Sequence, residues 1–351
     1  MSRLSQAISD LRAAKSCVRI VGHDSKSAWY PDSDAQVFNV VEQASGIIDY
    51  QPDELVITAF AGTPVEEVQQ ALAERNQIFA FEPPHFNNKG TLGGMVSSGF
   101  SGPARKWAGS VRDAVLGVEL INGKGEALRF GGQVMKNVAG YDVSRLIAGS
   151  FGWLGVIEAA SIRVHPMAQM TTTLTLSMDL QQALHFCHSL QRQYLPLSGT
   201  WWVDGTLHIR LAGTESGVAA ACQKLGGDHQ PDEVLWQEVC DQSHSFFAGS
   251  AGTDLYRVIV PAAADPFTGT QEQAFEWGGG LRWLWHENSE TVNSWARAQG
   301  GWAWRMGSMM PVDENQLKLM QALKAAFDPD GVFANLVLDV PKHQVGDAHA
   351  H

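Results

Sequence analysis

The stretch GTLGGMVSSG, residues 90–99, decides how the rest of the chain is interpreted. It holds four glycines within ten residues, with small hydroxyl side chains among them. Backbone without side chains lets N–H groups approach a large ligand closely, which suits a phosphate-bearing cofactor. A glycine-rich surface turn is the alternative for this run taken alone. The residues predicted to contact such a ligand are Thr91, Leu92, Gly93, Gly94, Ser97, Ser98 and Gly99.

A second candidate loop lies near the N-terminus, where a predicted strand at 18–21 leads into GHDSK, residues 22–26. A strand that ends in glycine and short polar residues offers consecutive N–H groups to an anion. A plain turn is the alternative, but the later glycine run favours the anion site. The candidate contacts here are Gly22, His23, Asp24, Ser25 and Lys26.

Strands and turns follow the glycine run. Residues 115–121 predict a buried strand, and Asn122-Gly123 predicts a hairpin turn into the next strand. Residues 136–166 predict a short helix after Asp142 and a turn from Gly152 to Gly155 into another strand. Gly152, Gly155 and Ile157 lie in the last of the motifs that carry the family resemblance described next, and that resemblance implies them as a third group of candidate contacts. Upstream, Thr63, Pro64 and Glu66 predict a helix start with Thr63 as N-cap, Pro64 in the first position and Glu66 completing a capping box.

Three motifs in this order, GTLGG, RDAVLG and GYDVSRLIAGSFGWLGVI, resemble the FAD-binding domain of the p-cresol methylhydroxylase and vanillyl-alcohol oxidase type of flavoprotein. Within that type, the chain is most similar to the FAD-binding E subunits of bacterial glycolate oxidase. The resemblance implies FAD as cofactor and an α+β fold. The expected parts are a two-subdomain FAD-binding domain (1–169), a smaller α+β cap domain (170–310), a C-terminal helix that returns to the FAD domain (311–341) and a disordered tail (342–351).

The resemblance also implies a function. It indicates an FAD-dependent oxidoreductase subunit that takes part in oxidising the CH–OH group of glycolate, a 2-hydroxy acid. The implied partners are a larger FAD-containing catalytic sister subunit and an iron–sulfur subunit that receives the electrons. Complete relatives carry a histidine cluster of the form H-x-G-x-G-x-x-H, which this sequence lacks, so the catalytic residues stay unassigned. The alternatives are a self-sufficient 2-hydroxy-acid oxidoreductase and a non-catalytic flavin-domain scaffold.

Some relatives attach their flavin through a histidine in the first loop. Here Arg19 and His23 have the matching R-x-x-G-H spacing, but Asp24 departs from the usual glycine- and serine-rich continuation. The FAD is therefore expected to be bound without a covalent link.

Cations follow the glycine run in the segment SGPARKWAGSVR, residues 101–112. Arg105 and Arg112 are candidates for neutralising the flavin pyrophosphate or a reduced flavin ring. A solvated basic loop, or an ion pair between Arg112 and Asp113, is the alternative.

Composition limits the remaining function classes. The net charge of −12 disfavours binding to nucleic acid or to anionic lipid. The four cysteines form no Cys-x-x-Cys pair, so we expect no disulfide framework, metal site or iron–sulfur cluster in this chain. No apolar run approaches the roughly 20 residues that span a bilayer, and residues 1–16 lack a signal-peptide core. A cytoplasmic protein is expected, associated with a membrane only through partners.

Tryptophans gather in the expected cap. Trp283 with Trp285, and Trp302 with Trp304, alternate so that each pair lies on one face of a strand. The sequence leaves open whether these faces are core or a protein interface.

Overall fold

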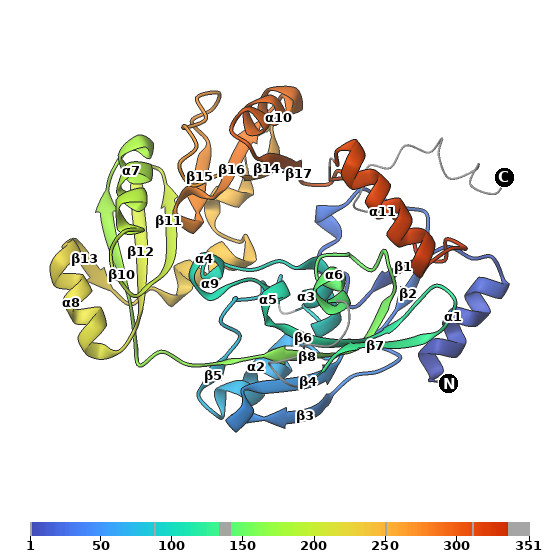
Figure 1. Cartoon of the computed structure of the whole chain (residues 1–351). Helices are drawn as coiled ribbons and strands as arrows, with labels where there is room; N and C mark the ends of the chain where they lie inside the picture. Colours follow the sequence, from blue (N-terminus) through green and yellow to red (C-terminus); the bar gives the residue numbers. More distant parts are fainter. Residues whose placement is uncertain (1, 88, 133–141, 250, 311, 336–351) are drawn as a thin grey trace.

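The first half of the chain is built around a five-stranded antiparallel sheet in the order β3-β4-β8-β6-β7 (Figure 1). The computed structural model of the protein describes residues 2–87, 89–132, 142–249, 251–310 and 312–335. Two short pairs, parallel β1-β2 and antiparallel β5-β9, stand outside this sheet. The strands are β1 (Val18–Val21), β2 (Gln36–Asn39), β3 (Ile47–Gln51), β4 (Val56–Phe60), β5 (Gln77–Ile78), β6 (Val115–Ile121), β7 (Ala127–Gly131), β8 (Val156–Arg163) and β9 (His165–Pro166).

Short helices join these strands. They are α1 (Arg3–Ala13), α2 (Val65–Ala73), α3 (Leu92–Ser98), α4 (Arg105–Ala108), α5 (Val111–Ala114) and α6 (Val143–Ile147). The apolar faces of α2 and α3 are buried in one core with the sheet. The glycine run, expected as a loop, thus becomes the helix α3. Asp142 precedes α6 as predicted, whereas Lys136–Tyr141 of that motif lies outside the described residues.

The predicted capping box at the start of α2 is wrong. The N-cap position is Pro64, and no side chain caps the helix. The hydroxyl of Thr63 is instead engaged with the backbone of Gly46, at 2.9 Å from its N–H and 3.0 Å from its carbonyl oxygen. Its backbone carbonyl accepts the N–H of Leu92, so this residue ties the start of α2 to the glycine run.

The hairpin between β6 and β7 is confirmed, but its turn is longer than the two residues predicted. It spans 122–126, and Asn122 Oδ1 accepts the N–H groups of Lys124 and Glu126 at 3.0 and 2.9 Å. The left-handed position is Gly125, with φ of 79°. Gly123 donates its N–H to the carbonyl of Phe327, and a Cβ there would overlap the carboxylate of Asp328.

The second half of the chain forms an eight-stranded antiparallel sheet in the order β13-β10-β12-β11-β15-β16-β14-β17. One half of it has the β-α-β-β-α-β order of ferredoxin-like folds, with α7 and α8 packed on its strands. The other half is covered by α10 (Figure 1). The strands are β10 (Met170–Ser177), β11 (Leu197–Val203), β12 (Thr206–Gly213), β13 (Asp228–Gln230), β14 (Asp254–Ile259), β15 (Gln273–Glu276), β16 (Leu281–His286) and β17 (Trp302–Arg305); the helices are α7 (Leu180–Leu190), α8 (Glu215–Leu225), α9 (Glu233–Asp241) and α10 (Ser289–Ala298).

The tryptophan-bearing face of this sheet is core. Trp201, Trp283 and Trp304 are at most 2% exposed, and they pack with Trp29 and Phe100 from the first half of the chain. Ring centroids of Trp29 and Trp304 are 5.0 Å apart. Trp201, Trp283 and Trp304 are therefore core residues whose rings join the two halves, whereas Trp285 and Trp302 pack against this cluster and are only partly buried.

The chain returns to its start through α11 (Glu314–Phe327), drawn in red beside α1 and β1 in Figure 1. Val18 donates its N–H to Val332 and accepts the N–H of Ala334, both at 2.8 Å. Residues 332–334 therefore lie alongside β1. The expected tail at 342–351 lies outside the described residues.

Asp328 holds this return in place. Its fully buried carboxylate accepts the N–H groups of Val332 and Phe333, both at 2.9 Å. Lys324 Nζ pairs with the same carboxylate at 2.5 Å and also donates to the carbonyls of Trp153 and Phe333. The α+β fold class is confirmed by these elements.

We predict that Asp328→Ala lowers the free energy of unfolding by about 3 kcal/mol, because it leaves two buried N–H groups without an acceptor and the Lys324 ammonium without its carboxylate partner. Chemical denaturation measures this loss. Asp330→Ala is the matched control: Asp330 pairs with Arg12 at a largely exposed site, so a change below about 0.5 kcal/mol is expected. Equal losses in the two variants would contradict the role given to Asp328.

Candidate functional site

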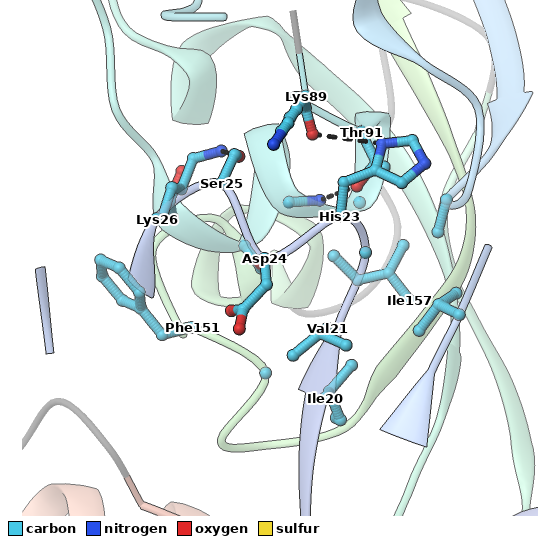
Figure 2. Close-up of a pocket in the computed structure, with 18 of the residues that line it drawn as sticks. Ile20, Val21, His23, Asp24, Ser25, Lys26, Lys89, Thr91, Phe151 and Ile157 are labelled. Atoms are coloured by element: carbon cyan, nitrogen blue, oxygen red, sulfur yellow. Dashed lines mark hydrogen bonds between the residues drawn. The ribbon is translucent and has the colours of Figure 1, made fainter. Parts of the chain in front are cut away.

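Three segments that are far apart in the sequence meet at one cavity (Figure 2), here called the glycine cavity. They are the loop after β1, the start of α3 and the turn into β8. The predicted residues that line it are Gly22, His23, Asp24, Ser25, Lys26, Thr91, Gly93, Gly94, Ser97, Ser98, Gly152, Gly155 and Ile157.

Glycines let these segments come together. A Cβ on Gly93 would lie 2.7 Å from the Cβ of Ala61, and one on Gly22 would overlap the hydroxyl of Thr91. That hydroxyl caps α3 by accepting the N–H of Gly94 at 3.2 Å. Gly152 has φ of 76°, a conformation that L side chains rarely adopt. The bare backbone is therefore needed for the cavity to form.

The two ends of the glycine cavity differ in character. Figure 2 shows Ser25, Lys26, Lys89 and Thr91 at one end, and the apolar side chains of Ile20, Val21 and Ile157 at the other. Its free volume is about 70 Å³, and the cavity is open on one side. This arrangement suits part of a long ligand with a charged group and an apolar group.

Lys26 is a buried cation at the polar end. Its side chain is nearly enclosed, with Nζ 3.4 Å from Ser25 Oγ and 5.2 Å from the ring centroid of Phe86. Burial lowers the pKa of Lys26 from 10.5 to about 8, while the charge of Asp241 opposes the shift. In the described part of the chain no carboxylate lies within 4.0 Å of this ammonium. An anionic ligand would supply the missing countercharge.

Asp24 and His23 have partners within the protein. The carboxylate of Asp24 pairs with Arg19 at 2.6 Å, and the hydrogen bond raises the pKa of Arg19. This pairing lets an acidic residue stand in a loop that faces an anion. His23 Nδ1 donates to the carbonyl of Lys89 at 3.2 Å, a backbone contact rather than a free ring nitrogen.

A second cavity, of about 230 Å³, adjoins the first and shares Ser98 and Phe151 with it. We call it the arginine cavity, because Arg105, Arg112 and Arg257 all line it. The first two come from the segment after α3, and Arg257 comes from β14 of the second sheet. The arginine cavity therefore lies where the two halves of the chain meet.

Four predicted contact residues lie away from the glycine cavity. Leu92 is wholly buried in the core beneath α3, so its side chain does not line the glycine cavity, and its role as a contact stays a prediction. Gly99, Arg105 and Arg112 line the arginine cavity instead. The Arg112–Asp113 ion pair is also wrong, because the Asp113 carboxylate accepts the N–H and hydroxyl of Ser110, and the backbone bond lowers the pKa of Asp113.

Sequence reasoning missed several lining residues. Lys89, immediately before the glycine run, was detectable as a cation beside bare backbone. Arg257 was detectable as a lone cation inside the apolar strand DLYRVIV. The others carry no chemical signal of their own and are Ile20, Val21, Tyr30, Val40, Ala61 and Phe151.

In the described ranges, no group of three His, Cys, Asp or Glu side chains is placed to hold a metal ion. None of the helices described is both long and apolar enough to cross a bilayer.

Comparison with known proteins identifies the family. Residues 1–131 match the model of the FAD binding domain. Over 338 residues the chain is 41% identical to the glycolate oxidase subunit GlcE of Escherichia coli strain K12, which covers 95% of this chain and 94% of the relative. The chain belongs to the GlcE family. It carries an FAD-binding domain and is an oxidoreductase subunit by family.

More distant relatives match parts of this GlcE-family chain. The D-lactate dehydrogenase of Archaeoglobus fulgidus is 28% identical over 153 residues, 43% of this chain and 34% of the relative. The glycolate oxidase subunit GlcD of Bacillus subtilis is 29% identical over 128 residues, 36% of this chain and 26% of the relative. A solved alkyldihydroxyacetonephosphate synthase aligns over 94% of this chain and 75% of its own, with a TM-score of 0.69 at 13% identity, which shows a shared fold.

The residues present fit FAD. The close approach at Gly22 and Gly93 leaves backbone beside the polar end, and Lys26 lacks a countercharge that a pyrophosphate carries. The adjoining arginine cavity gives a long dinucleotide room to extend.

We predict that FAD affinity of the flavin-free protein falls as pH rises through about 8, because Lys26 then loses its charge. In the absence of ligand, the same depressed pKa destabilises the fold below about pH 8, and this penalty fades as pH rises toward 10.5. Lys26→Met is expected to bind FAD roughly tenfold more weakly at neutral pH. Its affinity for FAD should not fall as pH rises through about 8. Quenching of flavin fluorescence measures both affinities. A variant that kept the wild-type pH dependence would exclude Lys26 as its source.

We also predict that Gly94→Val prevents FAD uptake by a folded protein. A Cβ there would lie 3.1 Å from Thr91 Oγ1 and 3.7 Å from Lys26 Nζ, so further side-chain atoms would crowd the polar end. Gly217→Val is a matched control, since Gly217 has the same place after the N-cap Thr214 of α8 and its Cβ would lie 3.0 Å from that hydroxyl. Flavin content of the two purified variants, with circular dichroism, decides the matter. Normal flavin content in Gly94→Val would refute the prediction.

Proposed function

We propose that this chain is the FAD-binding subunit of a glycolate oxidase complex, which takes part in the two-electron oxidation of glycolate to glyoxylate. The observation that carries the proposal is the convergence of three glycine-bearing segments beside a cavity lined by arginines. The 41% identity to a glycolate oxidase subunit over nearly the whole chain supports the substrate class.

In this proposal the predicted residues of the glycine cavity hold the FAD, without a covalent link. The pyrophosphate lies at the polar end near Lys26, and the flavin extends toward the arginine cavity. Bound flavin supplies a hydride acceptor for the CH–OH group. Arg105 and Arg112 are placed to attract the substrate carboxylate.

The proposed domains follow the two sheets. Residues 1–169 form the FAD-binding domain, 170–310 the cap, and 311–341 the return to the FAD-binding domain. The cap meets the FAD-binding domain at the tryptophan-rich contact and contributes one wall of the arginine cavity.

The proposed partners are a larger FAD-containing catalytic sister subunit and an iron–sulfur subunit. In the proposed complex, the iron–sulfur subunit takes the electrons from the reduced flavin. The four cysteines of this chain are free.

A self-sufficient 2-hydroxy-acid oxidoreductase is the second candidate, favoured by one observation. The arginine cavity adjoins the glycine cavity within this single chain, so flavin and substrate carboxylate have places in the same subunit.

The test is stopped-flow reduction of the isolated, FAD-loaded chain by glycolate and D-lactate, repeated with its partner subunits. We predict slow or absent flavin bleaching by the isolated chain and fast bleaching in the complex. Bleaching of the isolated chain at the rate of the complex would establish the self-sufficient enzyme instead. Failure to take up FAD would overturn both.

A further inference from the structure

Arg257 is the cation of the arginine cavity that lies deepest among aromatic rings. Its guanidinium is 5.8 Å from the ring centroid of Phe100, 5.3 Å from that of Trp277 and 6.0 Å from that of Trp283. Arg105 lies 4.5 Å from the ring of Trp277. Among the described residues, none of the carboxylates pairs within 4.0 Å with the three arginines of this cavity. The cavity thus gathers positive charge in a chain of net charge −12.

The ring between Arg105 and Arg257 is held in a strained conformation. Trp277 has φ of 54°, which is rare for a bulky residue, and it is only 4% exposed. Its indole N–H donates to the carbonyl of Gly102 at 3.0 Å, which fixes the ring against the first half of the chain. Strain of this kind persists where the surrounding structure imposes it, and it is concentrated at functional sites.

A carboxylate is buried behind Arg257. Glu276 is 3% exposed, and its Oε1 accepts the indole N–H of Trp283 at 2.8 Å. Glu276 and Arg257 both line a small cavity of about 20 Å³, which is enough for one water molecule. Arg257 therefore has a buried carboxylate on one side and the arginine cavity on the other.

The other ionisable groups near Glu276 are either paired with groups of opposite charge or neutral. Glu82 pairs with Arg210 of β12 at 2.5 Å and accepts the N–H of Ala104 at 2.8 Å. The thiol of Cys240 on α9 has a pKa raised well above its usual range by burial. Burial raises the pKa of Glu276 to about 7 and lowers that of Arg257 to about 10. Arg257 is thus the nearby cation whose charge is divided between Glu276 and whatever enters the arginine cavity.

We propose that Arg257 is the cap-side arm of a carboxylate-binding subsite, opposite Arg105 and Arg112, and that Glu276 takes up a proton when the carboxylate binds. The proposal rests on the proposed function, and the ligand class is the carboxylate of a small 2-hydroxy acid. An anion beside Arg257 draws the guanidinium charge toward the cavity and adds negative charge near Glu276. Both effects favour the neutral acid.

Proton uptake by Glu276 makes the affinity for the carboxylate depend on pH in a definite direction. When the bound anion raises the pKa of Glu276, binding is tightest at low pH and weakens as pH rises through about 7. Between about pH 6 and pH 8 the affinity should fall roughly five- to tenfold, with uptake of close to half a proton at pH 7. Arg257 is a ligand-contacting residue in this scheme, and Glu276 acts through it as a positioning residue.

Calorimetric titration of the FAD-loaded full-length protein with oxalate tests the proposal. Oxalate is a small carboxylate that resists hydride removal, and buffers of different ionisation enthalpy report the proton uptake. Glu276→Gln keeps an acceptor for Trp283 but cannot take up a proton, so its oxalate affinity should be independent of pH. Arg257→Met and Arg112→Met should each weaken binding roughly 10- to 100-fold. Arg297→Met, at an exposed pair with Glu290, is the control and should match the wild type.

Two results would overturn the inference. One is unchanged oxalate affinity in a folded Arg257→Met variant, or in Arg112→Met, at normal flavin content. The other is proton uptake that persists in Glu276→Gln. Because Arg112 is exposed, its variant reports on the subsite even when Arg257→Met fails to fold. If the wild-type protein takes up FAD but does not bind oxalate, this inference alone is contradicted. If the protein takes up no FAD, the proposed function is contradicted.

Discussion

The close contact between the loop after β1 and the start of α3 is the constraint on which the rest of the structure depends. It exists only because Gly22 lacks a side chain, since a Cβ there would overlap the hydroxyl of Thr91. In the same way, Gly93 lets the start of α3 pack closely on Ala61, which follows β4. The hydroxyl of Thr91 then serves both as the cap of α3 and as the surface on which the loop rests. Polar backbone from two distant segments is brought to one place, and the cofactor cavity results from that packing.

A second contact determines what the cavity can do. The tryptophan face of the eight-stranded sheet packs on Trp29 and Phe100 of the first half, and Arg257 of β14 lines the same cavity as Arg105 of α4 and Arg112 of α5. Arg257 thereby reaches a cavity whose other cations, Arg105 and Arg112, lie far before it in the sequence. The interface between the two sheets therefore both buries apolar rings and positions cations, because the ring of Trp277 lies against the guanidinium groups of Arg105 and Arg257.

Features whose signal lies in adjacent residues could be predicted from the sequence, whereas features that depend on contacts between distant residues could not. Glycine runs and a strand that ends in GHDSK indicate an anion site because the signal lies in adjacent residues, and most of those residues line the glycine cavity. The Thr63 cap failed because a buried hydroxyl can bond a distant backbone group, here Gly46, as readily as a helix N–H. The tryptophan pairs were placed on one strand face correctly, but only the fold shows what covers that face. Arg257 and Glu276 come to line one small cavity through a sheet register that no local pattern encodes.

The position of residues 332–334 alongside β1 bears on how the protein is made. The strand that carries the cofactor loop gains this neighbour only from the far end of the described chain. During synthesis, residues 1–334 must leave the ribosome before that strand has neighbours on both sides. A nascent chain that holds the glycine motifs alone therefore has this strand paired on the β2 side only.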